Sequence, residues 1–176
     1  MRLDHDWIAD HVPHQGRMCL LDEVLSWDSQ QLLCRTGTHR CHDHPLRAHG
    51  RLGSACAIEY AAQAAAVHGA LLALSGMVPI ADGTGPGSRA GAGMLVGARA
   101  LELAVERLDD IAEDLLVGAL RLHADARSAR YGFELQQADA GGGGARRRLA
   151  QGRLSIWLLT AGAAPAAPAP QAPGPG

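Results

Sequence analysis

Glu59, His49 and His14 are the residues of this chain best suited to acid–base chemistry. Glu59 lies among small apolar residues, in a segment that is expected to be helical from residue 54 to about 74. Burial without a partner raises the pKa of a carboxyl group, and a raised pKa would suit a general acid. We expect Glu59 to be catalytic, with His49 as the first candidate for the base and His14 as the second. The alternative is a structural Glu59 that bonds loop amides or faces an exposed helix end.

Two further polar residues lie in the same helical segment. Gln63 follows Glu59 by four positions and so shares its face of the helix. Its amide is expected to hold either the carboxyl group or the substrate, unless it is simply a satisfied buried amide. His68 follows Glu59 by nine positions, which turns its side chain to the opposite face. We expect His68 to be a structural histidine at the sheet or at a subunit boundary.

Two patterns resemble cofactor sites but do not meet the requirements of one. Residues 41–44 with His49 supply Cys, His and Asp side chains, but Pro45 stiffens this segment and no second group of ligands has a standard spacing. The glycines of residues 83–87 follow no strand of a βαβ unit, so they indicate a loop and not a nucleotide site. We expect neither a metal nor an organic cofactor.

The segment around Glu59 dominates the expected architecture. The helix at 54–74 is apolar nearly all round, which is typical of a helix enclosed by other structure. Ser54 is a plausible N-cap and Gly76 a plausible terminator. A short helix is expected within residues 1–13, and a His-rich loop over residues 39–53.

Six segments have the composition and alternation of strands, and several glycine-rich or proline-rich segments separate them. Residues 77–92 are expected to be a loop, residues 139–145 a hairpin turn, and residues 161–176 a disordered tail of Ala, Pro, Gly and Gln. One domain over residues 1–160 follows, with an α+β fold in which an antiparallel sheet wraps around the helix. The expected strands are residues 18–27, 31–38, 93–103, 115–124, 129–138 and 149–159.

Bulk composition limits the partners and the compartment. The formal net charge of −2 argues against nucleic acid and against a polybasic membrane contact. The four cysteines form no CxxC pair, which favours free thiols in a reducing compartment. The N-terminal segment has acidic residues and histidines where a signal peptide needs an apolar run. We expect a soluble, cytoplasmic protein.

Three segments resemble the predicted 3-hydroxyacyl-[acyl-carrier-protein] dehydratases of the hotdog superfamily. Residues 13–24, PHQGRMCLLDEV, are similar to the PHxxPMxLLDrV entry of bacterial 3-hydroxyacyl-carrier-protein dehydratases. His44-Pro45-Leu46-Arg47 leads into the helix, and residues 58–64, IEYAAQA, are similar to its E-x-x-A-Q motif. With AVHGALL after it, the helix looks most like the group that includes the dehydratase-like partners of aryl polyene gene clusters. The resemblance runs from about residue 8 to 159.

The resemblance implies a hotdog fold and a dehydratase, or dehydratase-like protein, acting on 3-hydroxyacyl groups of acyl carrier protein in fatty-acid or polyene-type biosynthesis. It implies a homodimer or a heterodimer with another hotdog subunit, and substrate contacts from Gln63, Tyr60 and Gly53. The catalytic Gly-His-Phe-Pro-Gly loop of the superfamily is replaced by a shorter one, in which His49 precedes Glu59 by ten residues. Two alternatives therefore stay open: a non-catalytic partner of an active subunit, and an acyl thioesterase.

Overall fold

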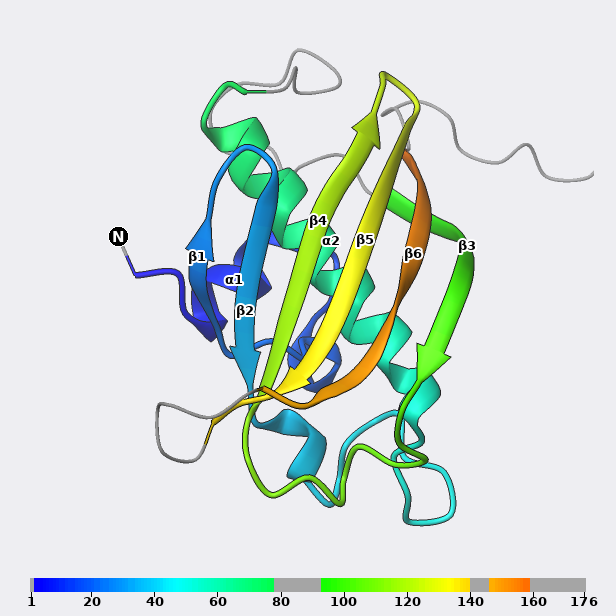
Figure 1. Ribbon diagram of the computed structural model, residues 1–176. Helices are drawn as coiled ribbons and strands as arrows, with labels where there is room; N and C mark the ends of the chain where they lie inside the picture. The colour runs from blue at the N-terminus through cyan, green and yellow to red at the C-terminus, as the bar shows by residue number, and fades with distance from the viewer. Residues whose placement is uncertain (1, 78–92, 140–145, 159–176) are drawn as a thin grey trace, which may run out of the picture.

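The computed structural model describes residues 2–77, 93–139 and 146–158. One antiparallel sheet of six strands, in the order β1-β2-β4-β5-β6-β3, curves around the long helix α2, Ala57–Leu74 (Figure 1). The short helix α1, His5–His11, lies on the same side of the sheet as α2 (Figure 1). This arrangement confirms the predicted α+β class and the sheet wrapped around a central helix.

The strands lie close to where the sequence predicts them. β3 and β4 have the predicted bounds, and β5 and β6 are displaced by a single residue at each end. The first strand is shorter than predicted, because Gly16–Met18 forms a 3-10 turn and pairing begins only at Glu23. The expected loop, turn and tail lie outside the described residues, apart from residues 77 and 139. The strands are β1 Glu23–Trp27, β2 Gln31–Thr36, β3 Gly93–Leu103, β4 Leu115–Ala124, β5 Ser128–Gln137 and β6 Arg148–Leu158.

A row of small and branched apolar side chains crosses the middle of the sheet towards α2. The register pairs Cys34 with Val117, Val117 with Leu135, and Leu135 with Ala150, so the row runs through four strands. All four side chains are buried. Since residues two apart on a strand share a face, this register fixes which side of every strand meets the helix.

The start of α2 differs from the prediction. Ser54 begins a 3-10 turn, Ser54–Cys56, and the α-helix proper starts at Ala57 with Cys56 as its N-cap. The predicted capping by Ser54 is wrong, since no side chain caps this helix; the backbone amide of Ser54 instead donates to the carbonyl of Glu106. The lead-in is held by backbone pairing to a neighbouring loop.

The end of α2 confirms the predicted terminator. Gly76 has φ +68°, a left-handed conformation that glycine adopts without steric cost. Its amide donates to Ala73, and the amide of Met77 donates to Leu72. These two bonds form a Schellman motif, which satisfies carbonyls that the helix end would leave open.

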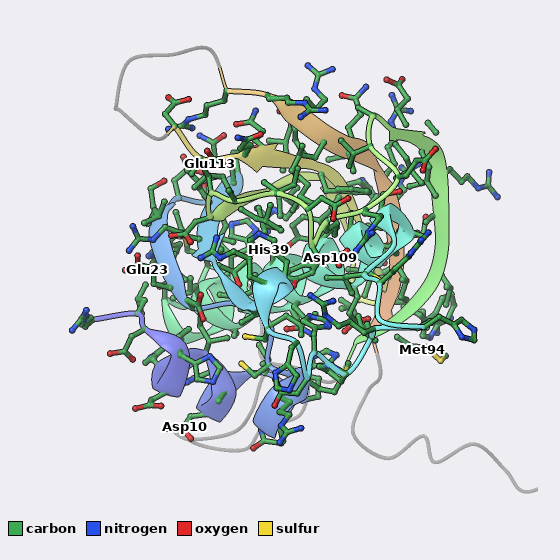
Figure 2. The ribbon with its side chains drawn as sticks, turned by 90° about the horizontal axis from the view of Figure 1, so that it is seen from below. Asp10, Glu23, His39, Met94, Asp109 and Glu113 are labelled. Atoms are coloured by element: carbon green, nitrogen blue, oxygen red, sulfur yellow. The ribbon has the colours of Figure 1, made fainter. Side chains whose placement is uncertain are left out.

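A buried carboxylate anchors the loop that precedes α2. Asp109 accepts the backbone amide of Leu52 at 2.9 Å and the guanidinium groups of Arg47 and Arg107 at 3.1 and 2.6 Å. These donors hold the pKa of Asp109 well below its usual range. Figure 2 shows Asp109 among the loops at this end of the molecule. The N-terminal end of α2 is therefore firmly placed.

The segment Ser54–Leu74 is long and apolar enough to cross a membrane by length and composition. However, 61% of the tested window is buried inside the molecule. Its apolar surface is therefore explained by packing beneath the sheet.

Candidate active site

The structure brings His14 and Glu59 into direct contact. Nε2 of His14 lies 3.0 Å from Oε1 of Glu59. His14 follows Pro13 just after the C-terminal end of α1, and Glu59 lies in the first turn of α2. The pair therefore connects the end of one helix with the start of the other. The side chains are 27% and 29% exposed, which leaves the pair reachable from solvent.

Gln63 fixes the carboxylate of Glu59. Its Nε2 donates to Oε1 of Glu59 at 2.9 Å and to the carbonyl of Met18 at 2.7 Å, while its Oε1 accepts the amide of Leu20 at 2.8 Å. Gln63 is fully buried, and these three bonds satisfy both of its amide hydrogens and its oxygen. The predicted contact between Gln63 and the carboxyl group is present, and it also ties the segment before β1 to the helix.

The pKa of Glu59 is lowered, whereas the sequence led us to expect a raised value. The hydrogen bond from His14 is the main cause, and the bond from Gln63 adds to it, while partial burial acts in the opposite direction. The prediction failed because it assumed an unpartnered carboxyl group. Two donors directed at one oxygen favour the ionised form, so Glu59 is an acceptor at neutral pH.

The hydrogen-bond pattern determines how His14 can act. An ionised carboxylate only accepts hydrogen bonds, so its bond to His14 requires the hydrogen on Nε2. Nδ1 is then the ring nitrogen that is left to accept a proton. Nδ1 is covered by protein and has no hydrogen-bond partner among the described residues. A carboxylate on one ring nitrogen and a free second nitrogen is an arrangement that suits a general base.

His49 lies apart from this pair in the single chain. It is exposed, with φ +52°, at the tip of a tight turn closed by the bridge between Ala48 and Arg51. Within the described residues it makes no hydrogen bond or ion pair with Glu59. His14, the second candidate for the base, is the histidine that the fold places beside the carboxylate.

Tyr60 and Gly53, the other expected substrate contacts, have different surroundings. Tyr60 has no exposed surface, and its hydroxyl is shared between His44 and Thr38 at 3.0 Å each. Tyr60 is thus enclosed in this structure, and a substrate contact at this residue stays a prediction. Gly53 is exposed just before the 3-10 turn that leads into α2, with no atom within 4 Å of the position that a Cβ would occupy. Open backbone there leaves room for a ligand beside the helix start.

The sequence alone does not reveal the structural role of His44. It is buried and joins the loop before α2 to Tyr60. The His44-Pro45 motif marked the position, but its partner lies sixteen residues along the chain, and only the fold brings the two together. His39, which Figure 2 shows near the middle of the molecule, is likewise buried, and its Nε2 lies 3.1 Å from the carbonyl of Ile111.

His68 has the structural role that the sequence predicts. Its Nε2 lies 2.8 Å from the carbonyl of Asp28, so Nε2 donates, and Nδ1 accepts from the hydroxyl of Tyr131 at 3.1 Å. Burial lowers the pKa of His68, which favours the neutral ring. His68 thus connects α2 to the β1–β2 turn and to β5, away from Glu59.

Metal ligands do not gather in the parts of the chain that the structure describes. No group of three His, Cys, Asp or Glu side chains there could hold an ion. The four cysteines are free thiols, of which Cys19 and Cys34 are buried. His44, one member of the possible metal cluster, is instead used by Tyr60 and by the amide of Leu46.

A hollow of about 670 Å³ lies elsewhere, on the outer face of the sheet. Its lining includes Leu120, Leu122 and Gly132, and none of the polar residues beside Glu59. Its titratable lining residues are Glu102, Glu134 and Arg153, with no histidine among them. The polar pair at the start of α2 is therefore the better candidate site.

Comparisons with known proteins agree with this architecture. The sequence matches the model of the ApeP-like family, described as ApeP dehydratase, over residues 7–158. Among solved structures, a chain of the dehydratase heterocomplex ApeI:P from Xenorhabdus doucetiae is 22% identical, with a TM-score of 0.67 over 86% of this chain and 90% of that chain. No protein among those with curated descriptions matches.

Two thioesterases share the fold at lower similarity. Thioesterase superfamily member 2 of zebra fish is 19% identical, with a TM-score of 0.55 over 88% of this chain and 93% of that chain. A thioesterase family protein from Silicibacter pomeroyi is 10% identical, with a TM-score of 0.52 over 78% of this chain and 84% of that chain. These likenesses identify the hotdog fold. The family match spans most of the sequence, and the chain belongs to the ApeP-like dehydratase family.

Proposed function

We propose that this chain is a dehydratase subunit that removes water from 3-hydroxyacyl thioesters carried on acyl carrier protein. Family membership supports the reaction class. The observation that carries the proposal is the His14–Glu59 contact at 3.0 Å, which Gln63 holds in place. This pair supplies a base and a carboxylate at the start of the central helix, as elimination of water requires.

In the proposed reaction, one proton is removed from C2 of the acyl group and one is donated to the C3 hydroxyl. His14 removes the proton from C2 of the acyl group after its ring shifts to uncover Nδ1, which protein covers in the unliganded chain, while Glu59 on Nε2 stabilises the imidazolium that forms. The pair then returns a proton to the C3 hydroxyl, which leaves as water with the C3–O electron pair as the C2=C3 double bond forms. Open backbone at Gly53, just before the start of α2, is the proposed contact for the thioester carbonyl.

A second hotdog subunit is part of this proposal. β3 is an edge strand, and Met94, Leu95 and Val96 on it are 52%, 37% and 57% exposed. Figure 2 shows Met94 at the margin of the molecule. Long apolar edge strands favour pairing with another chain. A dimer of like or unlike hotdog subunits would cover this edge, and the related ApeI:P structure is a heterocomplex.

The wider setting is proposed on the same basis. We place the protein in the cytoplasm, as a single domain over residues 1–160, in fatty-acid or aryl-polyene-type biosynthesis. The charge of −2 and the buried central helix support a protein without nucleic-acid or membrane partners.

Two other functions fit particular observations. A non-catalytic partner subunit is favoured by the shortened loop, whose His49 is exposed and has no hydrogen bond to a carboxylate among the described residues. A thioesterase is favoured by an ionised Glu59, since a carboxylate can direct water at a thioester without histidine. Their products differ from those of a dehydratase.

The deciding experiment follows the acyl group by mass. The purified chain, with any hotdog subunit that co-purifies, is incubated with a 3-hydroxyacyl-carrier-protein. We expect loss of one water to give the enoyl thioester, and a rate reduced at least roughly 100-fold in Glu59→Gln. Free acid would identify a thioesterase. Turnover that is unchanged in Glu59→Gln, or absent, would identify a non-catalytic subunit.

A further inference from the structure

A chain of hydrogen bonds begins at the buried His44, in the loop before α2. The amide of Leu46 donates to Nδ1 of His44 at 3.1 Å, so the hydrogen of the neutral ring is on Nε2. Nε2 lies 3.0 Å from the hydroxyl of Tyr60 and donates to it. Burial lowers the pKa of His44, and the nearby charge of Arg47 adds to this effect. The ring is therefore neutral and the direction of this first bond is fixed.

The second part of the chain passes from Tyr60 to the backbone before β1. Because burial raises the pKa of Tyr60, its hydroxyl keeps its proton and donates it to Oγ1 of Thr38 at 3.0 Å. The hydroxyl groups of Thr38 and Thr36 both donate to the carbonyl of Leu20, at 2.8 and 2.6 Å. Both acceptor positions of that carbonyl are thereby used.

The third part passes from Leu20 to the candidate site. The amide of Leu20 donates to Oε1 of Gln63, so the oxygen of this side chain must face Leu20 and its NH2 group must face Glu59. If the side-chain amide of Gln63 were rotated by half a turn, its NH2 group would face the amide of Leu20 and its oxygen would face the carboxylate of Glu59. Donor would then meet donor, and acceptor would meet acceptor. The bonds at His44, Tyr60 and Gln63 thus each have one direction, while the hydroxyl of Thr38 lies within reach of both the Leu20 carbonyl and Oγ1 of Thr36.

We propose that Tyr60 is a positioning residue for Glu59, acting through Thr38, the backbone of Leu20 and Gln63. The proposal rests on the role of Glu59 proposed above. The hydroxyl of Tyr60 holds Thr38 against the Leu20 carbonyl, which fixes the backbone of Leu20. The amide of Leu20, in the peptide group on the other side of its Cα, then orients Gln63, and Gln63 presents its hydrogen to the carboxylate. Without the Tyr60 hydroxyl, the segment from Met18 to Leu20 loses one of its two ties to the helix.

The charged and titratable groups near this path come from several elements. His14, after α1, faces Glu59 directly, and Cys56, at the start of α2, is close enough for the charge of Glu59 to raise its pKa. Asp22 and Cys41 lie near the Tyr60 hydroxyl. These four groups all remain when only the Tyr60 hydroxyl is removed. A change in the titration midpoint of Glu59 in that variant would therefore come from the hydrogen-bonded path and not from these groups.

A matched control exists within the fold. Tyr131 is also buried, and its hydroxyl also bonds a buried histidine, His68, at 3.1 Å. That pair leads to the carbonyl of Asp28 and not to Gln63. Tyr131→Phe therefore removes a comparable hydroxyl with no path to Glu59.

The test is an NMR titration of the Glu59 carboxyl carbon, assigned by its loss in Glu59→Gln, in the wild type, Tyr60→Phe and Tyr131→Phe. A lost hydrogen bond changes an equilibrium by about fivefold, so we expect the Glu59 midpoint to rise by up to roughly 0.7 pH units in Tyr60→Phe. The midpoint should be unchanged in Tyr131→Phe. An unchanged midpoint in Tyr60→Phe, or an equal rise in both variants, would overturn the proposal.

Two additions keep the outcome decisive. If Tyr60→Phe does not fold, Thr38→Val interrupts the same path at a half-buried position and is titrated in its place. In the dehydration assay, Tyr60→Phe should lower kcat/KM severalfold and move the acidic limb of the pH profile upward, whereas Tyr131→Phe should do neither. If the wild type shows no turnover, the proposed function fails while the titration still decides the role of Tyr60.

Discussion

Glu59 differs from an ordinary buried carboxylate because two donors converge on one of its oxygens. His14 and Gln63 both bond Oε1, so partial burial does not neutralise the group. The resulting ion holds the His14 ring in the tautomer with its hydrogen on Nε2. A base and its orienting carboxylate are thereby set in the resting state, before any substrate arrives.

The pH dependence of stability follows from the lowered pKa of Glu59. A carboxyl group whose folded pKa lies below its ordinary value of 4.5 stabilises the fold above that pH, and the contribution is lost as the pH falls through the folded pKa. We expect the wild type to exceed Glu59→Gln in free energy of unfolding near neutral pH, with the difference vanishing in acid. Urea unfolding at a series of pH values measures it. A difference that grows towards acid would contradict the ionised pair.

The sequence predicts the members of the site better than their contacts. His14, Glu59 and Gln63 all stand in recognisable motifs, but the positions of His14 and Glu59 differ by 45 in the chain. Their contact depends on how the segment before β1 crosses the start of α2, which no local pattern encodes. The direction of the Glu59 pKa shift was mispredicted for the same reason, because it depends on partners that only the fold supplies.

Backbone geometry determines where the helix α2 begins and where it ends. Its C-terminus depends on the left-handed conformation of Gly76, and its N-terminus on the 3-10 turn Ser54–Cys56. The register of its side chains against the sheet keeps Glu59 at the open end and His68 in the interior. A shift of the helix by one residue would move both.

Replacing Gly76 or Gly69 by alanine should change the free energy of unfolding in opposite directions. Gly76→Ala meets no neighbouring atom but retains φ +68°, so we expect a loss of roughly 1 kcal/mol in unfolding free energy. Gly69→Ala, inside α2 and equally unobstructed, should gain roughly 0.5–1 kcal/mol from helix propensity. Thermal or urea unfolding measures both variants. Equal effects of the two substitutions would refute the assigned helix end.

Strand positions were predicted best where polar or glycine-rich segments border the strand, and poorly before β1. β3 and β4 match their predicted bounds, since polar or glycine-rich segments border them in the sequence. Residues 18–22 have the apolar content of a strand, yet their backbone hydrogen bonds go largely to Gln63 and to turns. Apolar content alone does not distinguish a strand from a buried connecting segment.

For the whole molecule, β3 is an edge strand whose outer side pairs with no other strand among the described residues. Its exposed apolar side chains, among them Met94 and Val96, contrast with the covered inner face of the sheet. The outer face also exposes Leu122, at 50%, on β4, a strand that lies between β2 and β5 in the sheet. The edge, and not the outer face, is therefore the expected subunit boundary.

An aspartate introduced at the β3 edge or on the outer face of the sheet tests which of the two surfaces is the subunit boundary. Val96→Asp should weaken association with a second hotdog subunit at least about tenfold, because it places a charge in an apolar boundary. Leu122→Asp, a similarly exposed site on the outer face, should leave association unchanged. Analytical ultracentrifugation of the chain alone and of the co-purified complex measures both. Loss of association only in Leu122→Asp would place the boundary on the outer face.

The most direct test of the site compares two histidines in the dehydration assay. His14→Ala should reduce the rate of enoyl-thioester formation at least roughly 100-fold, because it removes the base beside Glu59. His49→Ala should stay within about threefold of the wild type, since surface loop substitutions away from a site have small effects. Full activity in His14→Ala together with loss of activity in His49→Ala would show that the contact at 3.0 Å between His14 and Glu59 is not the catalytic pair.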